Sequence, residues 1–197
     1  MPVAQMATGE RILAAAAEMT AELGWSGVTM AALAERVGVS RQTVYNEWGS
    51  RDRLAEAMVL RELGTFLDEV DAGFDAHPDD LESAVADAIS RVLGLARVNP
   101  LLRAIVTATH GAETELVPLL TTRADVVIAV ASERVRDRLV DYPGVRRASV
   151  DVTVDLLVRT VLSHVMQPGT QPDQVPRALA AAVVALVSPR PGEATAR

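Results

Sequence analysis

The sequence predicts an all-α protein in which a small N-terminal head of short helices is attached to a larger helical body. Apolar residues recur at three- and four-residue spacing through nearly the whole chain, which is the period of an amphipathic helix. No stretch alternates apolar and polar residues between hairpin turns, as half-buried strands do. The stretch SVDVTVDLLV (149–158) alternates briefly, but helical spacing continues after it, so we expect a helix there as well.

Breaks rich in glycine and proline divide the chain into about nine helical segments. The first three segments are short and most of the later ones are longer, which predicts a head over residues 1–53, a body over 54–187 and a disordered tail over 188–197. The expected helices cover residues 8–23, 30–37, 41–47, 51–75, 80–97, 100–109, 114–140, 145–166 and 173–187.

Composition excludes several classes of protein. Hydrophobic residues make up 49% of the chain and charged residues 23%, which is typical of a globular protein with a packed core. The chain has no cysteine, so disulfides, thiolate catalysis and cysteine-ligated zinc are excluded. The sequence shows no secretory signal and no apolar run of membrane length, and we expect a cytoplasmic protein that does not contact the membrane.

Charge is distributed unevenly along the chain. The net charge of −7 argues against non-specific binding to nucleic acid through the global field. All 19 basic residues are arginines, and four of them lie between residues 36 and 53, where there are two acids. This window therefore has a net charge of +2 and predicts a local basic patch.

Two short helices on either side of Gly38 form the pattern of a helix-turn-helix. Thr29 and Ser40 each precede a helix, where a hydroxyl can accept a hydrogen bond from the amides of the first turn. Gly38 suits the left-handed backbone of a sharp turn, Ala34 permits close approach of the helices, and Val44 packs inward. In such a motif the second helix lies in the major groove of DNA.

The outer side of the second helix carries side chains that suit DNA recognition. Arg41 can donate two hydrogen bonds to guanine, and Gln42 or Asn46 can pair with adenine. Hydroxyl groups can donate to phosphate, and the amides at helix N-termini attract phosphate as well. On these grounds the expected DNA contacts are Thr29, Ser40, Arg41, Gln42, Thr43, Tyr45 and Asn46.

Residues 24–54, GWSGVTMAALAERVGVSRQTVYNEWGSRDRL, resemble the DNA-binding head of the TetR family of bacterial transcriptional regulators, and the match covers about residues 8–58. The resemblance implies a homodimer that binds a palindromic, double-stranded operator, with its two heads in major grooves about 34–36 Å apart. It also implies that Arg51, which replaces the usual lysine, joins the DNA contacts.

Two features depart from the family pattern. No basic residue precedes residue 10, where many relatives carry a basic arm. Glu47 lies near the expected phosphates, where it could accept from a cytosine amino group or pair with Arg51 one turn later. We favour the ion pair, because solvated pairs within a helix are commoner than acids that read bases.

The resemblance implies that the body binds a ligand and forms the dimer, with the last two long helices packing against those of the partner. Segments 145–166 and 173–187 are the candidates. The last segment is apolar nearly all round, which predicts burial, either against a partner subunit or within the core of its own chain. The expected seam consists of Val175, Leu179, Ala182, Val183 and Leu186.

The body must also hold any effector. Aromatic residues make up only 3% of the chain, which favours an aliphatic ligand, such as an acyl chain with a polar head or a lactone, over a flat one held by stacking. Six polar residues lie among apolar neighbours, where each can serve either the effector or the structure: Arg103, Thr107, His110, Thr153, Thr160 and His164. The resemblance implies that ligand contacts there would act on the head through segment 51–75 and relieve repression.

Catalysis has no support in the sequence. The three histidines lie far apart without metal-ligand spacing, and neither a glycine-rich phosphate loop nor a nucleophile elbow occurs. We expect no catalytic residue, no metal site and no cofactor. The alternative to a DNA-binding regulator is a helical protein-interaction module that does not bind specific DNA.

Overall fold

The computed structural model describes residues 7–108, 124–169 and 172–189. It forms two compact units, which we call the head unit (residues 1–63 with 98–124) and the body unit (residues 64–97 with 125–197). Every regular element in the described ranges is a helix, so the predicted all-α class is confirmed. None of these helices is both long and apolar enough to cross a membrane.

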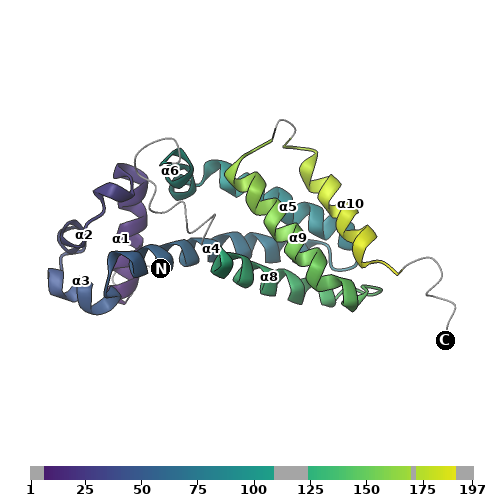
Figure 1. Cartoon of the computed structure of the whole chain (residues 1–197), viewed down its shortest axis with the longest axis horizontal. Helices are drawn as coiled ribbons and strands as arrows, with labels where there is room; N and C mark the ends of the chain where they lie inside the picture. Colours follow the sequence, from purple (N-terminus) through teal and green to yellow (C-terminus); the bar gives the residue numbers. More distant parts are fainter. Residues whose placement is uncertain (1–6, 109–123, 170–171, 190–197) are drawn as a thin grey trace. The chain divides into compact units, whose positions relative to one another are not determined.

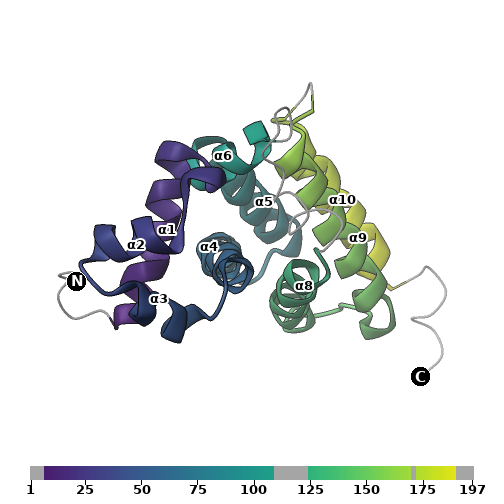
Figure 2. The same ribbon diagram turned by 60° about the vertical axis from the view of Figure 1, so that its left-hand side comes forward.

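The head unit begins with helix α1 (Thr8–Leu23), a short 3-10 helix η2 (Trp25–Gly27), α2 (Met30–Val37) and α3 (Arg41–Trp48). Figure 1 shows these elements at the purple end of the chain, and Figure 2 turns them forward. The first part of α4 (Arg51–Ala76) and α6 (Pro100–Ala108) complete the unit. Helices α1, α2 and α3 pack on one another around fully buried side chains, among them Ile12, Val28, Leu33, Val44 and Leu54.

The turn between α2 and α3 forms as the sequence predicts. The Thr29 hydroxyl accepts a hydrogen bond from the Ala32 amide (3.1 Å), and the Ser40 hydroxyl accepts one from the Thr43 amide (3.0 Å). Gly38 has a φ of 74°, in the left-handed region that disfavours side chains, which explains why glycine ends α2. The two caps and the turn therefore fix where α3 begins.

A buried asparagine starts α6 in the head unit. Asn99 is 6% exposed, and its Oδ1 accepts a hydrogen bond from the Leu102 amide (2.8 Å), which caps the first turn of α6. Its Nδ2 donates to the Glu62 carboxylate on α4. The same side chain therefore joins the first turn of α6 to the last turns of α4 in this unit.

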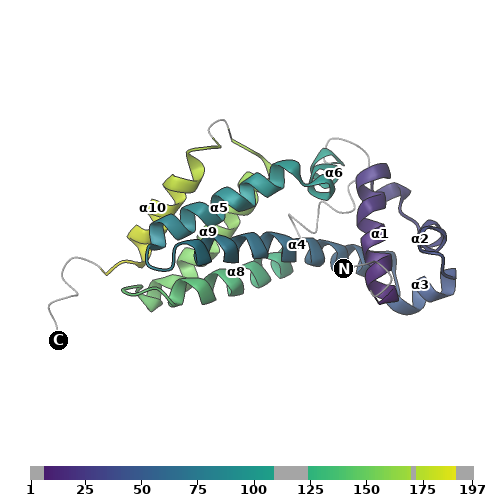
Figure 3. The ribbon, with the colours of Figure 1, turned by 180° about the vertical axis from the view of Figure 1, so that it is seen from behind.

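The body unit contains the second part of α4, α5 (Leu81–Val98), α8 (Asp125–Val140), α9 (Arg147–Met166) and α10 (Val175–Val187). Helix α9 packs against both α8 and α10, and Figures 1 and 3 show α9 and α10 side by side from opposite directions. The stretch 149–158 lies in α9, as predicted. A single helix was expected over residues 114–140, but α8 begins only at Asp125, because residue 124 is a turn. Residues 109–123 lie outside the described ranges.

Close packing and charge pairs hold α4 in the body unit. A Cβ on Gly73 would lie 2.5 Å from backbone atoms of Ala88, so the backbones of α4 and α5 touch there. On its other side α4 places Asp71 against Arg134 of α8. Tyr142 follows α8 and donates its hydroxyl hydrogen bond to the His77 carbonyl (2.6 Å), and burial raises the pKa of this tyrosine.

Helix α4 crosses from one unit to the other without a break. The units divide it after Leu63, and the sequence-based boundary between residues 53 and 54 stays a prediction. The disordered tail predicted for 188–197 falls almost entirely outside the described ranges.

Candidate nucleic-acid interface

Helix α3 presents an almost wholly polar, exposed surface. Its sequence is RQTVYNEW, and Val44 is its one fully buried side chain. Because Val44 packs on the core of the head unit, the residues on the other faces of α3 point outward. The exposed residues are Arg41, Gln42, Tyr45, Asn46 and Glu47, with Thr43 half-buried.

The exposed side chains of α3 are ordered by pairs one turn apart. The Arg41 guanidinium lies 5.5 Å from the centre of the Tyr45 ring, and its Nη2 donates to the tyrosine oxygen (3.4 Å). Gln42 donates its Nε2 hydrogen bond to the Asn46 Oδ1 (2.8 Å). These pairs hold a guanidinium, a phenol and two amides on one face of a helix. Such groups recognise guanine, phosphate and adenine, respectively.

The N-cap residues Thr29 and Ser40 are expected to act on DNA in a different way from the exposed side chains of α3. The Thr29 and Ser40 hydroxyls are already engaged by backbone amides, and Ser40 also lies 2.8 Å from the Thr43 hydroxyl. The N-termini of helices favour phosphate, because the remaining amides of the first turn have no partner within the helix. The contacts of these three residues with DNA stay predictions.

Arg51 is directed into the head unit. Its Nε donates to the Val28 carbonyl (2.9 Å), its Nη2 donates to the Trp25 carbonyl, and its guanidinium lies 4.6 Å from the centre of the Trp25 ring. The side chain is half-buried and joins the start of α4 to η2. Its expected contact with phosphate stays a prediction, but these observed contacts give it a structural role that the sequence did not indicate.

The expected ion pair between Glu47 and Arg51 is wrong. The Glu47 Oε2 lies 3.0 Å from the position that a Cβ on Gly9 would occupy, which places the carboxylate at the first turn of α1. A carboxylate is favoured there by the exposed amides and the dipole of the helix. The Arg51 guanidinium donates instead to two backbone carbonyls, those of Val28 and Trp25.

The basic patch is smaller than the window of residues 36–53 predicts. Arg36 pairs with Glu22 of α1 (2.9 Å), and its hydrogen bond and charge lower the pKa of the Glu22 carboxyl. With Arg51 directed inward, the exposed arginines of this window are Arg41, which contacts the neutral Tyr45, and Arg53. Counting charges along the chain missed Glu22, because an acid 14 residues away is a neighbour only in the folded head.

Two effector candidates serve their own helix. The Thr153 side chain is 2% exposed and its hydroxyl donates to the Ser149 carbonyl (2.7 Å). The Thr160 hydroxyl donates to the Leu156 carbonyl in the same way (2.6 Å). Both bonds belong to α9 and match the structural interpretation of these threonines.

The other effector candidates are dispersed. Arg103 is exposed on α6 in the head unit, and His164, on α9, lines a hollow in the body unit. Thr107 lies in α6, but its side chain is outside the described part of the structure, as is the whole of His110. Arg103 therefore belongs to a different unit from the three candidates on α9, and the effector contacts of all these residues stay predictions.

The expected dimer seam is divided between the two sides of α10. Val183 is 3% exposed and faces the core of its own chain with Pro176, Ala180 and Val187, so its place in a seam is wrong. The periodicity of α10 did not reveal this, because the helix is apolar on every side and only its packing against α9 selects the inner face. Of the other seam residues, Ala182 and Leu186 are exposed and Val175 and Leu179 are half-buried.

A glycine turn that presents an exposed polar helix on a small helical core defines a helix-turn-helix DNA-binding unit. A family model described as "Bacterial regulatory proteins, tetR family" matches residues 12–58, and one described as "Bacterial Tetracyclin repressor, C-terminal domain" matches residues 80–185. The chain belongs to the TetR family of bacterial transcriptional regulators. It is a DNA-binding regulator, and the family and its relatives are regulators rather than enzymes.

Among relatives, the HTH-type transcriptional regulator AlkX of Mycobacterium tuberculosis (strain ATCC 25618 / H37Rv) is 29% identical over 160 residues, covering 81% of this chain and 75% of that protein. The repressor AlkX of Dietzia sp. strain DQ12-45-1b, implicated in the biodegradation of n-alkanes, has a similar crystal structure (TM-score 0.75, 26% identity, covering 92% of this chain and 95% of that one). The structure of RolR with resorcinol (TM-score 0.65, 18% identity, covering 95% and 90%) shares the fold.

Proposed function

We propose that this regulator binds a palindromic operator as a homodimer, represses transcription there, and is released by a small aliphatic effector. The observation that carries the DNA-binding part is the exposed face of α3, on which Arg41, Tyr45, Gln42 and Asn46 are held in pairs. A regulator that works on chromosomal operators acts in the cytoplasm.

Exposed apolar side chains on the last two helices support the homodimer. Val152 and Leu156 of α9 are 66% and 51% exposed, and Leu186 of α10 is 44% exposed. Helices α9 and α10 pack on each other, and the Arg146 amide donates to the Val187 carbonyl (2.7 Å), which ties the start of α9 to the end of α10. A second copy of this helix pair would cover these side chains and complete a four-helix bundle.

Relatives and composition support an aliphatic effector. The Dietzia repressor, implicated in n-alkane biodegradation, is similar over nearly the whole of both chains. Aromatic residues make up only 3% of this chain, so a ligand would be held by aliphatic side chains. An acyl compound or a lactone is the class of effector that fits both observations.

Release from DNA requires that the effector bind one arrangement of the helices more tightly than another. Helix α4 is the continuous connection between the units, because it begins at Arg51 in the head unit and ends at Ala76 in the body unit. A ligand that favours one position of α4 would therefore change how the head meets DNA, and operator binding would weaken by the same coupling free energy.

Fluorescence anisotropy with DNA from upstream of the protein's own gene tests DNA recognition. Arg41→Ala and Tyr45→Ala should each weaken binding to the specific sequence by about 1–3 kcal/mol, or roughly 5- to 150-fold. Arg147→Ala removes an exposed arginine of the body unit and is the matched control, expected to bind as the parent does. Affinity should also fall as salt rises, because phosphate contacts release counterions. Unchanged binding by both α3 variants would show that α3 is not the recognition helix.

A further inference from the structure

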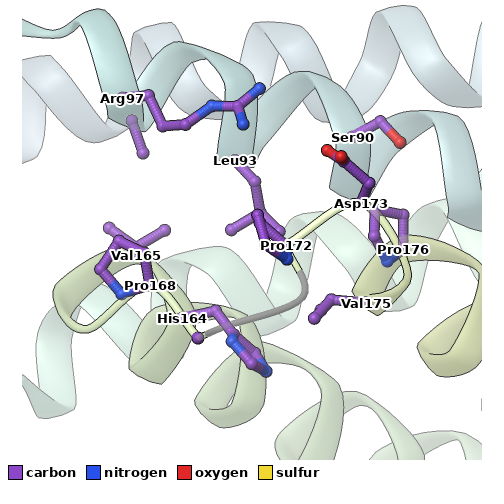
Figure 4. A pocket seen from close by; sticks show the side chains of 12 residues that line it. Ser90, Leu93, Arg97, His164, Val165, Pro168, Pro172, Asp173, Val175 and Pro176 are labelled. Atoms are coloured by element: carbon purple, nitrogen blue, oxygen red, sulfur yellow. The ribbon is translucent and has the colours of Figure 1, made fainter.

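A small hollow in the body unit combines opposite charges with apolar walls. It encloses about 190 Å³ at the end of α5, where Leu93 and Arg97 meet the last turn of α9 at His164. Asp173, which lies just before α10, and Val175, the first residue of α10, complete its lining. Figure 4 shows these side chains arranged around one space, with α5 on one side and α9 on the other.

We propose that this hollow binds a small aliphatic α-amino acid, with the ligand carboxylate on Arg97 and its ammonium group on Asp173. This proposal is separate from the aliphatic effector proposed above. It is inferred from the charges and the size of the hollow alone. Binding to it can be measured on the free protein, so its failure and the failure of operator binding are separate results.

The charges select the ligand class. A simple carboxylate placed in the hollow would meet the Asp173 carboxylate, and a simple amine would meet the Arg97 guanidinium, so either ligand gains from one side chain and is repelled by the other. An α-amino acid carries both charges on one carbon atom and satisfies both side chains together. Arg97 offers a planar fork that matches a carboxylate, and the Ser90 hydroxyl adds an acceptor for the ammonium group.

The remaining walls select an aliphatic side chain of limited size. Leu93, Val165 and Val175 line the hollow together with three prolines, whose fixed backbone keeps the rim preformed. A cavity of about 150 Å³ can hold benzene, so 190 Å³ accommodates roughly seven or eight non-hydrogen atoms. Valine has this size, whereas an aromatic amino acid does not fit.

The location gives binding a structural consequence. Arg97 lies in the last turn of α5, and Asp173 lies just before α10, so one bound ligand would connect the end of α5 to the start of α10. Both side chains are exposed without a ligand, so the ion pairs form in contact with water and each contributes modestly. We therefore expect a dissociation constant on the order of 1 mM.

The test is an NMR titration of the full-length protein with three ligands of matched shape. L-valine should bind saturably, whereas isovalerate, which lacks the amino group, and isobutylamine, which lacks the carboxylate, should bind at least tenfold more weakly. Arg97→Gln and Asp173→Asn should each weaken valine binding at least tenfold. Arg147→Gln, an exposed arginine of the same unit, should leave it unchanged.

Other outcomes overturn the proposal. Absence of saturable valine binding contradicts the site, and isovalerate binding as tightly as valine would show an anion site in which Asp173 takes no part. Equal binding of isobutylamine would show a cation site. Binding that persists in both variants would place the amino acid elsewhere. Amide spectra and thermal unfolding of the variants establish that each is folded before binding is compared.

Discussion

Replacement of Arg51 separates a structural role from a phosphate contact. Its guanidinium donates to the carbonyls of Val28 and Trp25 and covers the Trp25 ring at 4.6 Å. Two hydrogen bonds to a charged donor and one cation–π contact contribute about 2–4 kcal/mol together. We therefore expect Arg51→Ala to lower the free energy of unfolding of the head by that amount, or roughly 5–15 °C in melting temperature.

Lysine at the same position sharpens this test. Arg51→Lys keeps the positive charge but cannot reach two carbonyls with a planar fork, so it should lose about half of the stabilisation. A residue that acts only on phosphate would tolerate lysine, which is common at this position in the family. Arg53→Ala removes a neighbouring exposed arginine and should change stability by less than about 0.5 kcal/mol.

Urea unfolding followed by tryptophan fluorescence measures these changes directly. The only tryptophans of the chain are Trp25 and Trp48, so the signal reports the head unit. The variants are compared by their transition midpoints, because loss of the guanidinium over Trp25 also changes the fluorescence of the folded state. A midpoint for Arg51→Ala equal to that of Arg53→Ala would refute the structural role of Arg51.

Three further predictions concern the body unit. Gly73→Ala should destabilise the protein by about 1–3 kcal/mol, because the added Cβ meets the α5 backbone. A Cβ on Gly64, in the same helix, meets nothing within 4 Å, so Gly64→Ala should stabilise the protein by about 1 kcal/mol. Urea titrations of the two variants measure this difference. Leu156→Glu should shift the protein to monomer in light scattering, while Val126→Glu, on an equally exposed valine of α8, should not; a dimeric Leu156→Glu would contradict the seam. Tyr142→Phe should cost about 1 kcal/mol at neutral pH. Because burial raises the pKa of Tyr142, its stabilisation is present below the ordinary tyrosine pKa and is lost as pH rises through the raised one, so a parent and variant with identical alkaline unfolding would exclude this role.

Local signals in the sequence were sufficient for the elements of the head. Thr29 and Ser40 cap their helices and Gly38 turns between them, because these effects depend on residues three or four positions apart. The burial of Val44 follows from the same local period, and with it the exposed face of α3. Periodicity likewise distinguished a helix from a strand over residues 149–158.

Contacts between distant residues could not be predicted in this way. Val183 lies inside because α9 covers that side of α10, although its own helix is apolar on every side. Glu22 neutralises Arg36 from another helix, and Glu47 lies beside Gly9 rather than Arg51. No spacing along the chain encodes these neighbours.

The sequence by itself determined the helical class, the helix-turn-helix and the side chains that α3 exposes, because capping, turn formation and amphipathic period are local properties. Only the tertiary structure decided which charges remain available on that face and which side of α10 is left uncovered. It also brought Arg97 of α5 and Asp173, 76 residues later, to the same hollow. Electrostatic and packing free energies depend on distance in space, and the folded chain sets that distance independently of the separation in sequence.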